Sequence, residues 1–83
     1  MKHNFKNLKI WNQSIELATE IHVLTKKFPK SDRQILSSQM NRTAISVPSN
    51  IAEGSNRGDH HFKHYLNISL GSAFELHSLT IFS

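Results

Sequence analysis

Apolar residues recur every three or four positions near the start of the chain, which places their side chains on one side of an α-helix. The spacing predicts a helix from about Leu8 to Phe28, ended by Pro29. The apolar positions are Leu8, Trp11, Ile15, Ala18, Ile21 and Phe28. His22 falls within this stripe, so we predict a buried or half-buried histidine with a hydrogen-bond partner rather than a ligand.

A second apolar seam follows the proline. Ser31 and Gln34 have the spacing of a capping box, which predicts a helix start at Ser31. The seam consists of Leu36, Met40, Val47 and Ile51. Pro48 removes one backbone hydrogen bond, yet the apolar period keeps its phase across it. We therefore predict one helix with a kink at Pro48, ended by the glycine-containing residues 54–58.

The same helix carries a polar stripe with spacings of four, four, three and four: Arg42, Ser46, Asn50, Glu53 and Arg57. Glu53 and Arg57 have the i,i+4 separation of a helical ion pair. We predict that Arg42, Asn50, Glu53 and Arg57 form a structural polar network, inside the protein or between subunits.

A third helix is predicted from Asp59, a favourable N-cap residue. Its predicted inner face is Phe62, Leu66, Ser69, Ala73, Leu76 and Thr80, flanked by Tyr65 and Leu79. The helix runs to the last residue without a capping glycine, so we expect a sequence that is cut short. The fold class is all-α: residues 1–83 form one domain, a small helical bundle.

The amino-acid composition indicates in which cellular compartment the protein works. The 83 residues contain no cysteine, which fits a reducing environment and removes every thiolate site. No stretch has the length and apolarity of a signal peptide core or a membrane span. We expect a cytoplasmic protein without a membrane partner. Because so short a chain buries little surface, association with its own copies is an expected source of stability.

The net charge of +4 is concentrated near the start, where residues 1–30 hold six lysines and two glutamates. A local excess of lysine points to a polyanion, RNA or DNA. The predicted nucleic-acid-binding residues are Lys2, Lys6, Lys9, Lys26, Lys27 and Lys30. The alternative is that they only solvate the surface, with Lys26 and Lys27 complementing the dipole of the first helix.

Catalytic chemistry finds no support in the sequence. His60, His61 and His64 form a cluster, but a metal site needs more ligands than these one-turn neighbours supply. No glycine-rich phosphate loop and no paired carboxylates occur. We therefore predict no enzyme activity, no catalytic residues, no metal site and no cofactor.

The stretch Ser46–Arg57, with its internal proline, resembles the signature of the four-helix bundle proteins known as 23S ribosomal RNA intervening-sequence proteins. Phe5–Trp11 is similar to the family's opening, and Lys27–Pro29 to its first turn. Gly71–Ser72 and Glu75–Leu76 are similar to its third helix. The similarity covers nearly the whole chain.

The resemblance implies a bacterial, cytoplasmic, up-and-down four-helix bundle. Family members are similar to the accessory variability protein of diversity-generating retroelements, a homopentamer that binds nucleic acid and a reverse transcriptase. Some members are encoded inside insertions in ribosomal RNA genes, which is a location and not an activity. Against this pattern, we expect that the chain lacks the fourth helix, and His22 stands where an aromatic residue is common.

Two functions stay open. The first is a non-enzymatic, basic, oligomeric scaffold or accessory factor that binds nucleic acid or a nucleic-acid enzyme such as a reverse transcriptase. The second is a structural or protein-interaction module, including that of a truncated family member without independent activity.

Overall fold

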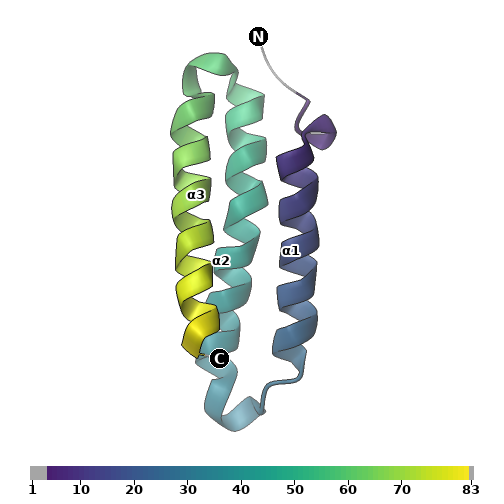
Figure 1. The fold of residues 1–83 in the computed structure, drawn as a ribbon, viewed down its shortest axis with the longest axis vertical. Coiled ribbons are helices and arrows are strands. Elements are labelled where there is room, and N and C mark those ends of the chain that lie inside the picture. Colours follow the sequence, from purple (N-terminus) through teal and green to yellow (C-terminus); the bar gives the residue numbers. More distant parts are fainter. Residues whose placement is uncertain (1–3, 83) are drawn as a thin grey trace.

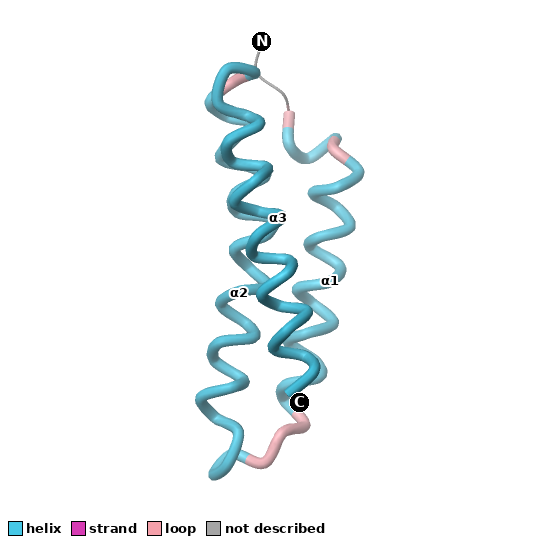
Figure 2. The backbone as a smooth tube through the Cα atoms, turned by 60° about the vertical axis from the view of Figure 1, so that its left-hand side comes forward, coloured by secondary structure: helices cyan, strands magenta, loops and turns pink. Residues whose placement is uncertain are grey.

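The protein, seen in a computed structural model, is described over residues 4–82, with the side chains of residues 30–32 and 82 excepted. A short 3-10 helix, η1 (Phe5–Asn7), precedes three α-helices. These are α1 (Lys9–Lys26), α2 (Lys30–Arg57) and α3 (Asp59–Phe82). No strand occurs in the described part (Figure 1), and only short loops separate the helices (Figure 2). The all-α prediction with three helices is confirmed.

Helix α2 is the central element of an elongated molecule measuring 47 × 19 × 15 Å. It packs along both α1 and α3, and η1 also lies against it. Among the described residues, no Cα atom of α1 comes within 8 Å of one in α3. The two outer helices are therefore joined through α2, with only side chains meeting between them.

Side chains from all three helices form the core. Its buried centre consists of Ile21, Met40, Ala44 and Leu76, with Ala18, Phe28, Leu36 and Leu79 packed against it. Val47 and Ile51 continue the buried seam of α2. The predicted seam is thus confirmed, as is the burial of Ser69 and Leu76 on the inner face of α3.

Helix α1 is rotated relative to the predicted stripe. Ser14, Ile21 and Thr25 are its buried residues, whereas Ile15 and His22 are exposed. The prediction of a buried or half-buried His22 is wrong. The physical reason is that α1 faces one neighbour, so only a narrow arc is covered. Ser14 and Thr25 tolerate burial because their hydroxyls donate to the backbone carbonyls of the preceding turn.

Helix α2 begins one residue before the predicted start, with Pro29 in the N-cap position and no side-chain cap. The expected start at Ser31 is therefore wrong, because proline already fixes an extended backbone there. The helix ends at Gly58, whose φ of 94° favours glycine. Gly54, expected to help end α2, instead lies inside it.

Helices α2 and α3 lie close together at Gly54. A Cβ atom placed at Gly54 would lie 2.7 Å from Tyr65 Cβ and 3.1 Å from Phe62 Cδ1. The neighbouring Ser55 is completely buried. The absent side chain at Gly54 is therefore what allows the two helices to pack at this distance.

Pro48 is buried within a continuous α2. One residue before it, the Val47 carbonyl accepts a hydrogen bond from the buried Ser69 hydroxyl of α3 at 2.9 Å. The missing N–H of Pro48 leaves the Ala44 carbonyl without its helical donor, and the Ser69 hydrogen bond instead ties α3 to α2 one residue before the proline. Bending of α2 at this point stays a prediction.

Two further side-chain contacts join the helices. Asn41 Nδ2 of α2 donates to Thr25 Oγ1 of α1 at 2.7 Å. Thr43 Oγ1 of α2 donates to the Glu75 carboxylate of α3 at 3.2 Å. Because Thr25 and Thr43 are both buried, these hydrogen bonds fix where each outer helix lies along the axis of α2.

Gly54→Ala is expected to destabilise the protein, because the new methyl group meets the Cβ of Tyr65, which lies too close to the backbone to move aside. We expect the free energy of unfolding to fall by about 1–3 kcal/mol, despite the better helix propensity of alanine. Gly71→Ala is the matched control, since nothing lies within 4 Å of its added carbon. That change should raise the free energy of unfolding by about 0.5–1 kcal/mol. Urea unfolding of both variants checks the pair, and effects of the same sign would contradict the close contact.

Candidate nucleic-acid interface

The described lysines of the predicted binding set divide into two groups at opposite ends of α1. Lys6 lies in η1 and Lys9 begins α1, while Lys26 ends α1 and Lys27 follows it. All four are exposed. Lys26 follows Lys9 by seventeen positions, so the two residues lie about 25 Å apart along the helix axis. Lys2 and the side chain of Lys30 lie outside the described part of the chain.

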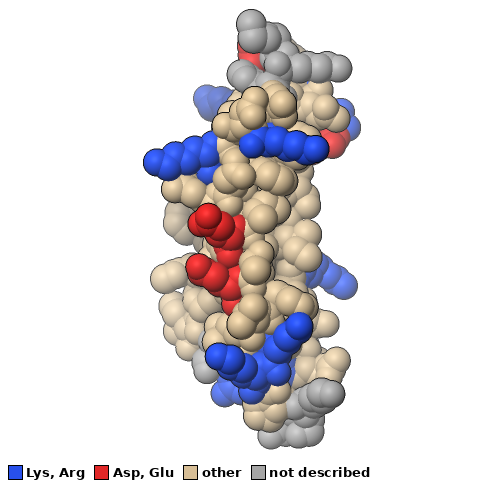
Figure 3. Space-filling model, turned by 90° about the vertical axis from the view of Figure 1, so that its right-hand side faces the viewer, with Lys and Arg blue, Asp and Glu red and all other residues tan. Residues whose placement is uncertain are grey.

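Acidic side chains lie between these two groups. Glu16 and Glu20, both exposed, are on the intervening turns of α1. Figure 3 shows this face, with carboxylates at mid-height between basic side chains above and below them, and a further basic side chain at the right edge at a similar height. The four described lysines of the predicted set therefore do not form one continuous basic surface on a single chain.

One end of the molecule gathers more basic groups than the sequence indicated. The start of α1 and the turn from α2 to α3 lie at the same end (Figure 1), so Arg57 and Lys63 join Lys6 and Lys9 there. His60, His61 and His64 are exposed in the first turns of α3. Lys63 went unassigned because its link to the first lysines arises only from the folded topology.

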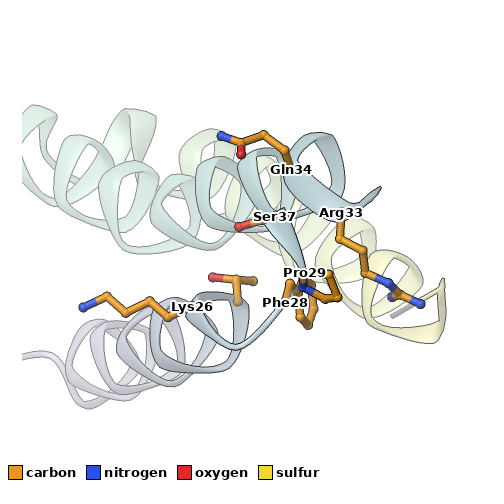
Figure 4. A pocket seen from close by; sticks show the side chains of 7 residues that line it. Lys26, Phe28, Pro29, Arg33, Gln34 and Ser37 are labelled. Atoms are coloured by element: carbon orange, nitrogen blue, oxygen red, sulfur yellow. The ribbon is translucent and has the colours of Figure 1, made fainter. Parts of the chain in front are cut away.

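The other end contains a half-open cavity of about 220 Å³ at the turn between α1 and α2. Lys26 and Arg33 both border it, together with Thr25, Phe28, Gln34 and Ser37. Figure 4 shows that Lys26 and Arg33 extend in opposite directions. The Arg33 guanidinium lies 5.6 Å from the centre of the Phe28 ring. Because the two cations diverge, the cavity is not built to hold an anion between them.

The predicted polar stripe on α2 is only partly brought together. Arg57 Nε donates to Glu53 Oε1 at 2.8 Å, and the two side chains are 52% and 45% exposed. Asn50 Nδ2 donates to the Ser46 carbonyl of its own helix. Arg42 is exposed and lies about 16 Å before Glu53 along the axis. Within one chain, the structure joins Glu53 with Arg57 but not with Arg42 or Asn50.

The environment of Arg57 favours its charged form. The hydrogen bond to Glu53, the Tyr65 side chain and the charge of Glu53 together raise the pKa of Arg57 above its ordinary value. Its guanidinium lies 5.4 Å from the centre of the Tyr65 ring, which belongs to α3. Arg57 therefore links the last turn of α2 to the beginning of α3.

The histidine cluster His60, His61 and His64 lies in the first turns of α3. The His60 and His61 rings meet edge to face, with centroids 4.9 Å apart. Over residues 4–82, no group of three His, Cys, Asp or Glu side chains is arranged to hold a metal ion. Within the same residues, no helix has the length and apolarity to span a membrane.

The fold and its surface define a small all-α protein whose exposed lysines gather toward both ends. A family model, the 23S rRNA-intervening sequence protein, matches residues 6–83. The chain belongs to the 23S rRNA-intervening sequence protein family. No curated protein and no solved structure gives a significant match to it.

Glu53→Gln tests whether the polar stripe of α2 contributes to the stability of a single chain. Since the pair with Arg57 is about half-exposed, we expect the midpoint of thermal unfolding to move by roughly 4 °C at most. Glu16→Gln, at an exposed carboxylate of α1, is the control. Circular dichroism measures both. A much larger fall for Glu53→Gln, together with loss of an oligomer, would instead indicate a network between subunits.

Proposed function

We propose that the protein is a non-enzymatic binding scaffold that contacts the phosphate backbone of RNA or DNA through its exposed lysines. The observation that carries this proposal is the placement of Lys6, Lys9, Lys26 and Lys27 at the two ends of one helix. The net charge of +4 supports it. Lysine ammonium groups neutralise phosphates without reading base edges, so binding is proposed to be independent of sequence.

The separation of the two lysine groups constrains how a nucleic acid is bound. A spacing of about 25 Å corresponds to about seven base pairs of a duplex lying along α1. Glu16 and Glu20 repel phosphates between these points. We therefore propose two separate phosphate contacts per chain rather than a continuous track along α1.

Assembly of several copies would raise the affinity for a polyanion above what the modest charge of one chain gives. Each added copy contributes another net charge of +4 and a further pair of lysine groups. Linked sites raise the overall affinity through effective concentration without new kinds of contact. We propose a homo-oligomer, for which the resemblance gives five copies. The resemblance alone supports a reverse transcriptase as partner and a bacterial source. A cytoplasmic location is proposed from the resemblance together with the sequence, which contains no cysteine.

The remaining features of the fold are proposed from the sequence pattern and, for the up-and-down arrangement, from the family. We infer that residues 1–83 act as one helical-bundle domain, with the up-and-down arrangement of the family and a bend of α2 at Pro48. The buried proline and the Ser69 hydrogen bond beside it support such a bend.

A protein-interaction module is the second candidate function. It is favoured by large apolar side chains that are exposed on α3, above all Phe74 at 65% and Ile81 at 72%. Such residues are unusual on a surface that meets only water or phosphate. The two candidates use different faces, so they can be tested separately.

The salt dependence of binding tests the phosphate contacts. For a short duplex, Lys9→Ala and Lys26→Ala should each lower the slope of log affinity against log salt by about one, because each removes one neutralised phosphate. Arg42→Ala removes the same charge from an exposed position in the middle of α2 and should leave the slope unchanged. Fluorescence anisotropy over a salt series gives the three slopes.

Two results would contradict the proposal. A wild-type affinity that does not change with salt would exclude phosphate contacts as its source. Equal, small effects of all three substitutions would show that only the net charge matters and that the ends of α1 have no special role.

A further inference from the structure

The first turns of α3 carry three histidines and a lysine on their exposed side. Phe62 and Tyr65 are half-buried and face α2 at Gly54, so they hold this part of α3 against α2. The other residues of the segment 60–65 are all exposed, and we call them the histidine–lysine surface: His60, His61, Lys63 and His64. Because the packing of the segment rests on Phe62 and Tyr65, these four side chains are accessible to a ligand.

Lys63 lies on the side of α3 that is turned toward α1. Leu70 and His77 border hollows of about 330 and 300 Å³ that side chains of α1 also border. Lys63 precedes Leu70 by seven positions, about two helical turns, so it lies on the same side of α3. The start of α1 is at this same end of the molecule (Figure 1). Lys63 therefore continues the basic group of Lys6 and Lys9 onto α3.

The three histidines continue the surface from Lys63 around α3. Residues three or four positions apart are neighbours on a helix. His60 is therefore a neighbour of both Lys63 and His64, and His61 is a neighbour of His64. The ring centroids of His60 and His61 are 4.9 Å apart. The four side chains thus form one continuous surface, on which three groups can gain a positive charge.

The described charges next to this surface lie on α2, against which α3 packs, and on α3 itself. Arg57 of α2 donates to Glu53, which offsets part of its charge, and its guanidinium lies beside the Tyr65 ring. On α3, Asp59 lies one turn before Lys63. Together with the lysines of η1 and of the start of α1, this end has four basic and two acidic side chains. Its net charge is therefore only +2 while the histidines are neutral.

Protonation of the three histidines changes this balance. Histidine is the side chain whose ordinary change of charge falls between pH 5 and 8. Three imidazolium groups would raise the net charge of this end from +2 to +5. Imidazolium rings as close as those of His60 and His61 repel one another, and a phosphate beside them would offset that repulsion. Proton uptake and phosphate binding therefore favour each other.

We propose that the histidine–lysine surface is a proton-dependent contact for nucleic-acid phosphates, which becomes stronger as the pH falls. Lys63 supplies a permanent charge beside the first lysine group, and the three histidines add charge only when they are protonated. The inference rests on the proposed function and deepens it, because it adds residues of α3 to one of the two phosphate contacts and makes that contact respond to acidity.

Fluorescence anisotropy with the short duplex at about pH 7.5 and about pH 5.5 tests the inference on the full chain. The phosphodiester charge of the duplex is the same at both values. The wild type should bind at least about tenfold more tightly at the lower pH, because added charges then contact phosphates. The triple variant His60→Asn, His61→Asn and His64→Asn should respond by less than about threefold. The control variant His22→Asn and His77→Asn removes two exposed histidines elsewhere and should keep a response of at least about fivefold.

Two further measurements separate phosphate contact from an effect on folding. The triple arginine variant, His60→Arg, His61→Arg and His64→Arg, should bind at the higher pH about as tightly as the wild type binds at the lower pH, because its charge does not depend on protons. The wild-type slope of log affinity against log salt should be steeper by about one to three at the lower pH. Lys63→Ala should lower that slope by about one at both values. Circular dichroism at both values establishes that every variant keeps its helices.

The results distinguish this inference from the proposed function. A wild-type affinity that is the same at both pH values, or a rise that the triple asparagine variant keeps in full, would overturn the inference. The salt slopes of Lys9→Ala and Lys26→Ala at the higher pH test the proposed function. Lowered slopes without a pH response would overturn the inference alone, and unchanged slopes with a histidine-dependent pH response would overturn the lysine contacts alone. No binding at either pH would overturn both.

Discussion

Helix α2 has to bury side chains on two faces at once, because α1 and α3 both pack along it and meet each other only through side chains. On one face, Asn41 holds Thr25 of α1, and on the other Thr43 holds Glu75 of α3. At Gly54, α2 and α3 approach so closely that a methyl group would meet Tyr65. The way in which α1 and α3 pack on α2 therefore determines which side chains lie together on the surface.

Periodicity was sufficient to predict three helices, the buried seam of α2 and the inner face of α3. Periods fix which residues share a side of a helix, and burial follows when that side has a neighbour. The same logic failed at Ile15 and His22, because α1 has only one neighbour and its buried arc is narrower than its apolar stripe. Gly54 was misread as an end signal, since glycine favours both helix ends and close helix contacts.

The candidate site was harder to predict, for a topological reason. Lysine-rich sequence near the start suggested one basic region, but a helix of 18 residues carries the two groups to opposite ends of the molecule. The folded chain instead brings Lys63 and Arg57 to the end that holds Lys6 and Lys9. Which charges become neighbours depends on the direction of successive helices, and spacing along one helix does not contain that information.

The two proposed contacts are compatible because the fold separates them. Self-association through the exposed apolar side chains of α3, such as Phe74 and Ile81, would leave the lysines at both ends of α1 exposed, so assembly and phosphate binding do not compete for the same surface. In a rigid homo-oligomer, the lysine groups of each copy would lie at fixed positions relative to those of the other copies. A rigid assembly would therefore lose less freedom on binding a polyanion than free chains, which is how a modest charge on each chain gains affinity. The apolar side chains of α3 would then act on nucleic-acid binding only through the geometry that they impose on the lysines.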